Sequence, residues 1–192
     1  WVALTALSEV VESGTTVDLD AIQLRAAAWQ GEDAVRAATG HEPPADGLHY
    51  RWPDLPSLRI ETRLVDKLAA VRAFAQVNSI DREVIVSAHA GVGIVTCGKA
   101  HHDLMEVLRR LEITPGMLAA AGVRLYKVGL SFPVEPTRLS TFAQGLRELL
   151  VIEEKGAIVE TQLRELFYNA AQRPVIVGKK DAAGAPLVSA VG

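Results

Sequence analysis

The stretch IVTCGKAHHD, residues 94–103, places the single cysteine of the chain beside two of its five histidines. Cys97, His101 and His102 are residue types that bind zinc, and their close spacing raises that possibility. However, Cys97 ends a predicted strand, whereas both histidines fall in the next predicted helix. Adjacent helical side chains point about 100° apart, and no further ligand of suitable spacing follows. We therefore expect no metal here, and we expect both histidines to be exposed in the first helical turn.

The same stretch offers a second kind of chemistry, anion binding. A strand that leads through Gly98 into a helix presents free backbone N–H groups, and Lys99 adds a positive charge. Yet TCGKAHHD does not match the phosphate-binding pattern GxxxxGK[ST], and a strand-to-helix turn needs a small residue for its geometry alone. The sequence favours a structural turn at Gly98, Lys99 and Ala100. A module that binds a small anion or a nucleotide there is the alternative.

Two adjacent carboxylates, Glu153 and Glu154, end the apolar run LLVIEE. Carboxylates at the end of a buried strand can act as acid and base if one of their pKa values is raised. Neighbours in a strand point to opposite faces, and a helix is predicted to begin near Ile158. We favour capping of that helix, or contact with a neighbouring domain, over catalysis. No GxSxG motif or other nucleophile–base pair indicates a self-contained enzyme.

The elements that must position these residues alternate regularly from residue 58 onward. Short, continuous apolar runs are typical of strands in a parallel sheet that helices cover on both faces. The sequence therefore predicts an α/β fold with a three-layer, mostly parallel sheet. The helix at 58–78 carries Leu64, Leu68, Val71 and Ala75 on one stripe. The other predicted helices span 99–111, 114–122, 137–149 and 158–171, and the predicted strands span 83–87, 92–97, 123–129, 149–154 and 174–179.

The first third of the chain has a different organisation. Residues 1–13 have the spacing of an amphipathic helix, TTVDLDAIQL alternates like a strand, and residues 25–40 are rich in alanine and could form a helix. The proline-rich segment 40–56 excludes a long helix or central strand and predicts a linker. Within it, Trp52 beside Pro53 is expected to pack the linker onto a domain, which makes Trp52 a candidate interface residue.

Composition restricts the partners. The net charge is −3, and the 20 Lys and Arg residues are scattered, which argues against nucleic-acid binding. No apolar run approaches the roughly 20 residues that span a bilayer. One cysteine excludes an internal disulfide framework, cannot ligate an iron–sulfur cluster alone, and fits a cytoplasmic protein. The chain opens without an initiator methionine, and we expect it to be a piece of a longer polypeptide.

Several long phrases resemble one known family. They are GIVTCGKAHHDLMEVLRRLEI (93–113), GVRLYKVGLSFPVEP (122–136), LLVIEEKGAIVETQLRELFYN (149–169) and RPVIVGKKD (173–181). Together with WVALTALSEVVESGTTVDLD (1–20) and GLHYRWPD (47–54), they are similar to the indolepyruvate ferredoxin oxidoreductases, which belong to the thiamine-diphosphate-dependent 2-oxoacid:ferredoxin oxidoreductases. The resemblance covers nearly the whole chain.

The resemblance implies a structural domain and no active site of its own. Residues 1–57 would be the end of a pyrimidine-binding domain with its crossover linker, and residues 58–192 a transketolase C-terminal-like domain. The parent enzyme would oxidise an aryl-2-oxoacid to an acyl-CoA and reduce ferredoxin, with thiamine diphosphate, magnesium and iron–sulfur clusters held outside this chain. A homodimer, assembled through the apolar amino-terminal segment, is also expected. The chain alone is expected to be inactive and to hold no cofactor.

Overall fold

The computed structural model describes residues 30–49, 51–54 and 57–187, together with Gly14, Thr16 and Asp18. The helix predicted at 1–13 and most of the strand predicted at 15–24 lie outside the described residues, as do Trp1 and Trp29. Among the described residues, no helix combines the length and the apolar character needed to cross a membrane.

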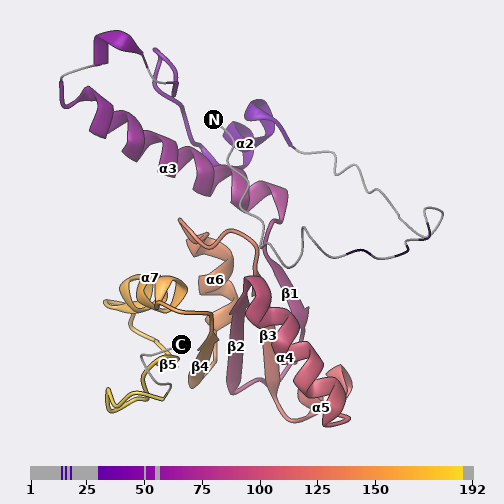
Figure 1. The fold of residues 1–192 in the computed structure, drawn as a ribbon. Helices are drawn as coiled ribbons and strands as arrows, with labels where there is room; N and C mark the ends of the chain where they lie inside the picture. The colour runs from indigo at the N-terminus through magenta and orange to yellow at the C-terminus, as the bar shows by residue number, and fades with distance from the viewer. Residues whose placement is uncertain are drawn as a thin grey trace.

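Twelve elements follow one another in the described part of the chain (Figure 1). The helices are α2 (Glu32–Thr39), the 3-10 turn η1 (Trp52–Asp54), α3 (Arg59–Asn78), α4 (Gly98–Arg110), α5 (Pro115–Ala120), α6 (Pro136–Ala143) and α7 (Ile158–Phe167). The strands are β1 (Arg82–Ile85), β2 (Val92–Cys97), β3 (Val123–Val128), β4 (Glu148–Ile152) and β5 (Val175–Val177).

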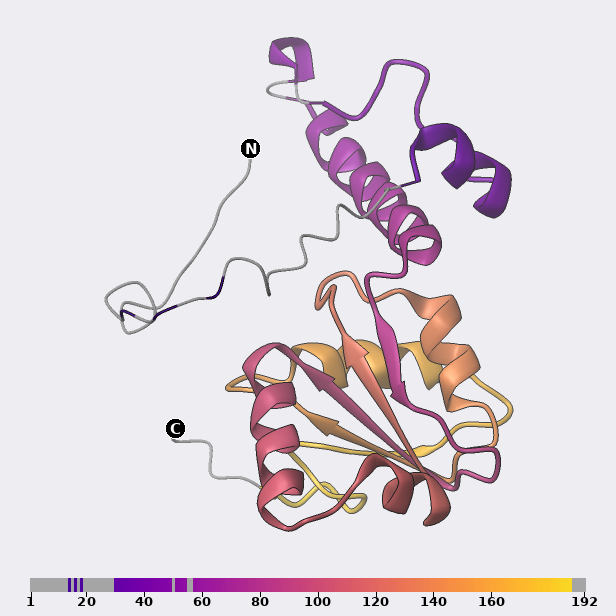
Figure 2. The same cartoon turned by 90° about the vertical axis from the view of Figure 1, so that its right-hand side faces the viewer.

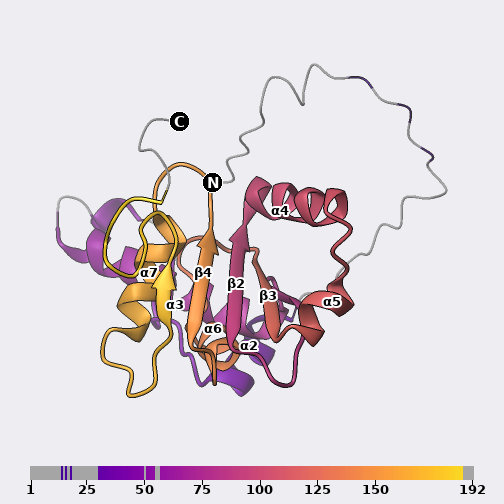
Figure 3. The same cartoon turned by 90° about the horizontal axis from the view of Figure 1, so that it is seen from below.

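The five strands form one sheet in the order β1-β3-β2-β4-β5, which Figure 3 shows for β3, β2, β4 and β5. The pairs β2–β3, β2–β4 and β4–β5 are parallel, and only the edge pair β1–β3 is antiparallel. Helices α4 and α6 lie on opposite sides of this sheet (Figure 2). The predicted α/β fold with a mostly parallel, three-layer sheet is confirmed.

The main core lies between the sheet and helices α6 and α7. Alternate strand residues face these helices, because successive side chains of a strand point to opposite faces. On the other face, Thr96 of β2 contacts His101 of α4. The buried residues of the main core are Val95, Tyr126, Val128, Val134, Leu139, Phe142, Ala143, Leu146, Leu149, Val151, Val159, Leu163, Phe167 and Ile176.

The prediction of a helix at 137–149 is wrong for the second half of that range. Helix α6 ends at Ala143, because Gly145 takes a left-handed conformation, with φ of 77°, and turns the chain. Strand β4 then begins at Glu148. At the start of α5, the Thr114 hydroxyl accepts a hydrogen bond from the Met117 amide at 3.2 Å, and Pro115 occupies the first helical position.

The α3 lobe (residues 30–49, 51–54 and 57–78) projects from the sheet unit (residues 82–187), as Figures 1 and 2 show. At 20 residues, α3 is about 30 Å long. The predicted stripe is partly wrong, because Leu64 and Val71 are exposed whereas Ala75 is buried. The lobe packs on the sheet unit only near the carboxyl end of α3, so most of α3 has no sheet to cover it.

Two polar side chains, Arg138 and Asp81, fix the junction between the lobe and the sheet unit. The Arg138 guanidinium of α6 donates to the Gln76 carbonyl at 3.0 and 3.1 Å and to the Ser79 hydroxyl at 2.8 Å. The buried Asp81 carboxylate accepts from the Gly129 amide at 2.8 Å and from the Tyr126 hydroxyl at 3.2 Å. These bonds hold the direction in which α3 leaves the sheet.

Candidate functional site

The sequence-predicted candidates other than Trp52 gather at the carboxyl edge of the sheet. Cys97 ends β2 and Glu153 follows β4, and these two strands are neighbours. The chain leaves β2 toward β3 and leaves β4 toward β5, on the other side, so the topology reverses here. Parallel α/β sheets commonly bind ligands at such a reversal.

Glu153 caps helix α7. Its Oε2 accepts hydrogen bonds from the amides of Ile158 at 3.0 Å and Val159 at 2.8 Å, and its Oε1 accepts from the Glu160 amide at 3.0 Å. A carboxylate at a helix amino end satisfies free N–H groups and the positive end of the helix dipole. The side chain is buried and both of its oxygens are occupied. The capping role predicted for Glu153 is confirmed.

Glu154 behaves differently from its neighbour. Its side chain is exposed, and its Oε1 lies 4.0 Å from the Lys99 amino group. Lys99 is bound more closely by Asp103, one turn further along α4, at 2.6 and 2.7 Å. That hydrogen bond raises the pKa of Lys99. The two neighbouring carboxylates thus have different roles, one as a buried helix cap and the other in an exposed ion pair.

The turn at Gly98, Lys99 and Ala100 has the backbone that either interpretation requires. Gly98 takes φ of 54°, and Cys97 makes no side-chain cap to α4. The Lys99 charge, which anion binding would use, is engaged by Asp103. Anion binding at this turn stays a prediction, which titration of the chain with phosphate and with nucleotides, followed by calorimetry, would check.

The prediction that His101 is exposed is wrong. His101 is buried, and its Nδ1 lies 2.9 Å from the Thr96 hydroxyl, which also bonds to the Tyr126 carbonyl at 3.2 Å. His102 is exposed. His101 lies on the same face of α4 as Leu108, seven residues further along, and both are buried. No cluster of three or more His, Cys, Asp or Glu side chains suited to a metal occurs within the described residues.

Burial gives the two reactive-type side chains of this stretch opposite pKa shifts. Burial raises the pKa of the Cys97 thiol, and the nearby charges of Glu153 and Glu154 raise it further. A raised pKa disfavours the thiolate, which is the nucleophilic form. Burial lowers the pKa of His101, helped by Lys127 and His102. Both groups are therefore held in their neutral forms at neutral pH.

A pH dependence of stability follows from His101. Because its pKa in the folded state lies below the ordinary value of about 6.5, the unfolded chain binds more protons in the window just below that pH. The contribution of His101 is complete above pH 6.5 and is lost as the pH falls toward the folded pKa. We expect the urea concentration at the unfolding midpoint to decrease as the pH is lowered from 7.5 to 5.5. His101→Gln should make the midpoint depend less on pH, whereas His102→Gln should leave the pH dependence unchanged. Equal pH dependence in all three proteins would contradict this account.

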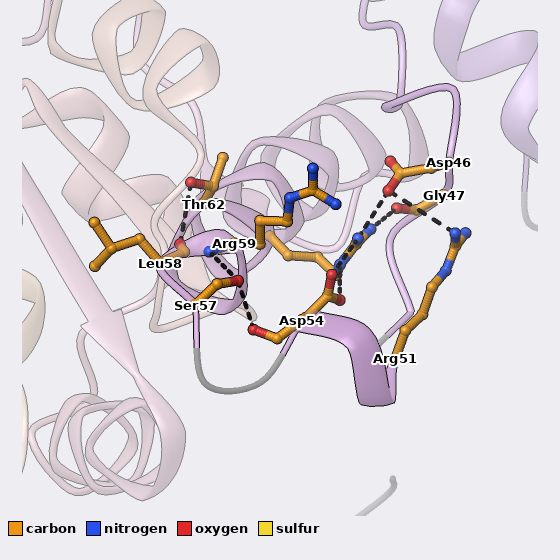
Figure 4. A network of polar contacts seen from close by, with 9 residues as sticks. Asp46, Gly47, Arg51, Asp54, Ser57, Leu58, Arg59 and Thr62 are labelled. Atoms are coloured by element: carbon orange, nitrogen blue, oxygen red, sulfur yellow. Dashed lines mark hydrogen bonds and ion pairs between the residues drawn. The ribbon is translucent and has the colours of Figure 1, made fainter.

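A buried ion pair anchors the linker to α3, and the sequence did not reveal it (Figure 4). The Arg63 guanidinium donates to the Asp54 carboxylate at 2.7 and 3.1 Å, to Asp46 at 2.8 Å, and to the Gly47 carbonyl. These hydrogen bonds lower the pKa of Asp54 and of Asp46 and raise that of Arg63. Arg63 thus fixes both ends of the linker segment that carries Trp52.

Trp52 was expected to pack the linker onto a domain, but it does not do so within the described part of this chain. Its side chain is 79% exposed, on the 3-10 turn that ends at Asp54. The anchoring expected of the tryptophan is performed by Arg63 instead. A fixed turn with an exposed tryptophan is compatible with an interface, since buried tryptophans are enriched among residues that dominate binding energy. The interface role of Trp52 stays a prediction.

The lobe also contains an apolar hollow of about 730 Å³. It is formed by α2, residues 41–48 and α3, and Val35, Val71 and Phe74 are among its lining residues. His41 also lines it, and its buried Nε2 atom has no hydrogen-bond partner among the described residues. The sequence predicted a linker laid over a surface in this region but no cavity.

Comparison with known proteins gives a consistent family signal. The profile of the indolepyruvate oxidoreductase domain matches residues 82–191. Two curated relatives are each named indolepyruvate oxidoreductase subunit IorA. The one from Thermococcus kodakarensis is 32% identical over 90 residues, which are 47% of this chain and 13% of the relative. The one from Methanothermobacter thermautotrophicus is 24% identical over 144 residues, which are 72% of this chain and 22% of the relative. The chain thus spans about a fifth or less of these relatives.

Solved structures give only a loose likeness. A 2-oxoglutarate:ferredoxin oxidoreductase from Magnetococcus marinus, with 2-oxoglutarate, coenzyme A and succinyl-CoA bound, aligns over 79% of this chain and 24% of its own, with 17% identity and a TM-score of 0.42. A split-gene transketolase, described as an inactive β4 tetramer, aligns over 52% of this chain and 32% of its own, with 19% identity and a TM-score of 0.38. Neither likeness is close enough to assign a residue or a ligand.

Proposed function

The chain belongs to the indolepyruvate oxidoreductase family, and from this premise we propose that it is a non-catalytic, structural domain of a larger oxidoreductase. The observation that carries the proposal is Glu153. It is the buried carboxylate at the sheet edge where a catalytic acid or base would be expected, and three amides of α7 occupy its oxygens. The neutral Cys97 thiol and the His101–Thr96 pair beside it are also engaged in packing.

The parent enzyme, in this proposal, acts on an aryl-2-oxoacid such as indolepyruvate. The 2-oxoacid loses carbon dioxide, its acyl group forms a thioester with coenzyme A, and two electrons pass to ferredoxin while one proton is released. The family membership and the printed names of the relatives support the 2-oxoacid part of this assignment. The choice of an aryl substrate, of coenzyme A and of ferredoxin rests on the resemblance of the long sequence phrases.

The described residues do not fit the cofactors that this chemistry implies. Iron–sulfur clusters take about four cysteine thiolates, and the chain has one cysteine. Within the described residues, no group of three or more His, Cys, Asp or Glu side chains is placed to hold a metal ion. We therefore assign all three groups to other parts of the polypeptide or complex, and residues 58–192 to a transketolase C-terminal-like domain that follows the pyrimidine-binding domain ending near residue 57. A cytoplasmic homodimer completes the proposal.

The experiment that tests this proposal compares two proteins. The complete polypeptide, with its partner subunits, should reduce ferredoxin or a viologen dye when given indolepyruvate and coenzyme A. The 192-residue chain should reduce neither acceptor under the same conditions. Glu153→Gln in the complete enzyme separates the roles: a structural cap lowers thermal stability and leaves turnover within a few-fold, whereas a catalytic carboxylate loses turnover by 10²-fold or more. The second outcome would overturn the proposal.

A further inference from the structure

The apolar hollow of the α3 lobe has one wall on α3 and another on the segment that precedes this helix. Lys67, Ala70, Val71 and Phe74 line it from α3, and their spacing of three, four and seven residues places them on one helix face. The facing wall comes from α2 and from residues 41–48 (Figure 1). The hollow is therefore built by two segments that pack together, with a continuous helix face on one side.

The size and lining of the hollow suit a small apolar molecule. Its volume is about 730 Å³, and pockets that bury a small ligand typically measure roughly 300–1,000 Å³. Most of the lining residues are valine, proline, alanine, leucine and phenylalanine. From Lys67 to Phe74 the helix rises about 10 Å. A ligand that fills the hollow can thus have an apolar body of about that length.

Two polar groups of this lining have no partner within the described residues. The Nε2 atom of His41 is buried and makes no hydrogen bond, which costs free energy unless a ligand supplies the partner. The Lys67 ammonium forms no ion pair in the same part of the chain. Glu32, the acidic residue of the lining, is already paired with Arg36 at 3.0 Å. The hollow therefore combines an unbalanced positive charge with an unused hydrogen-bonding nitrogen.

We propose that the apolar hollow binds a small carboxylic acid with an extended apolar body. The body lies against Val71 and Phe74, where the burial of apolar surface stabilises the complex. The carboxylate pairs with the Lys67 ammonium, and the Nε2–H of His41 donates a hydrogen bond to one of its oxygens. This site lies in the α3 lobe, away from the carboxyl edge of the sheet, and it does not depend on the reaction proposed for the parent enzyme.

Calorimetric titration of the 192-residue chain with octanoate tests this inference. A single octanoate should bind per chain, about tenfold more tightly than octan-1-ol, which has the same apolar body without the charge. Butanoate, which keeps the charge on a shorter body, should also bind at least about tenfold more weakly than octanoate, because it buries fewer methylene groups. Equal affinities for the three compounds, or several octanoates bound per chain, would overturn the proposal.

Substitutions at the two polar groups make the test specific. Lys67→Met keeps the apolar stem and removes the charge, so octanoate should bind about tenfold more weakly, whereas octan-1-ol should bind as before. His41→Phe removes the nitrogen and should also weaken the binding of octanoate alone. Lys180→Met is the matched control, because Lys180 is an exposed lysine of the sheet unit, and it should leave both affinities unchanged. The proposal is overturned if Lys67→Met or His41→Phe leaves the affinity for octanoate unchanged.

Filling the hollow gives a test that does not depend on charge. Ala70→Phe places a ring in the hollow and should abolish the binding of both octanoate and octan-1-ol. Ala69→Phe is its control, since Ala69 is exposed and does not line the hollow, and this variant should bind both compounds. Melting temperatures identify the variants that fold, and Lys67→Met decides the matter if Ala70→Phe does not. Octanoate binding that persists in folded Ala70→Phe would contradict the proposal.

The same titration of the complete polypeptide distinguishes a small ligand from a protein partner. Octanoate should bind there as tightly as it binds to the 192-residue chain, and Lys67→Met should weaken it to the same extent. Loss of octanoate binding in the complete polypeptide would mean that another part of the protein covers the hollow, and would overturn the proposal. Neither result depends on whether the complete polypeptide oxidises a 2-oxoacid.

Discussion

Replacing Gly129 by alanine is expected to destabilise the chain by about 3 kcal/mol, at the upper end of the usual cost of overpacking. A Cβ atom at this position would lie 2.5 Å from the Ile80 carbonyl oxygen, closer than such atoms approach, and the obstacle is backbone that cannot rotate away. The Gly129 amide also donates to Asp81 at 2.8 Å. Any shift that relieves the clash therefore disturbs the junction from which α3 leaves the sheet.

Urea unfolding monitored by circular dichroism measures this effect, and Gly156→Ala is the control. A Cβ at Gly156 would meet nothing within 4 Å, and this glycine does not need a left-handed backbone. Alanine there should be neutral or slightly stabilising, because it restricts the unfolded chain. Similar unfolding midpoints for the two variants would contradict the tight junction described here.

Removing the Glu153 side chain is expected to cost about 2 kcal/mol, as for the loss of a strong helix cap with buried donors left unpaired. Glu153→Ala leaves the amides of Ile158, Val159 and Glu160 without their acceptor at the start of α7. The Val159 side chain is fully buried in the main core, so water cannot easily replace the carboxylate. The loss should appear in the free energy of unfolding of the 192-residue chain.

The neighbouring residue provides a matched control for that experiment. Glu154→Ala removes the same side chain from an exposed position whose one ion pair spans 4.0 Å, and exposed pairs of this kind contribute little. Its unfolding free energy should stay within about 0.5 kcal/mol of the unsubstituted chain. Equal losses for the two variants would mean that Glu153 does not act as a cap.

The sheet could be predicted from sequence because its strands are short apolar runs separated by amphipathic helices. The run VGIVTC coincides with β2, the central strand of the sheet, whose residues are all buried or partly buried. The end of α6 was predicted poorly because Leu146 and Leu149 continue an apolar spacing across the Gly145 turn. There, the turn chemistry of one glycine outweighs the periodicity on both sides.

The candidate site could be predicted only where the partners are close in sequence. The Glu153 cap spans five to seven residues, and a carboxylate shortly before a helix is a local signal. The Arg63–Asp54 pair joins residues nine positions apart in the sequence, and no sequence pattern indicates that they meet. His101 was misplaced because its burial depends on which face of α4 packs on the sheet, and that face carries residues 101 and 108.

The measurement that tests the central claim most directly is a calorimetric titration of the 192-residue chain with thiamine diphosphate and magnesium. A structural domain whose edge carboxylate, thiol and imidazole are engaged within the fold should give no binding heat up to millimolar cofactor. The complete enzyme, titrated in parallel, should bind. Micromolar binding by the 192-residue chain alone would contradict the account, because it would place the cofactor site in the residues described here.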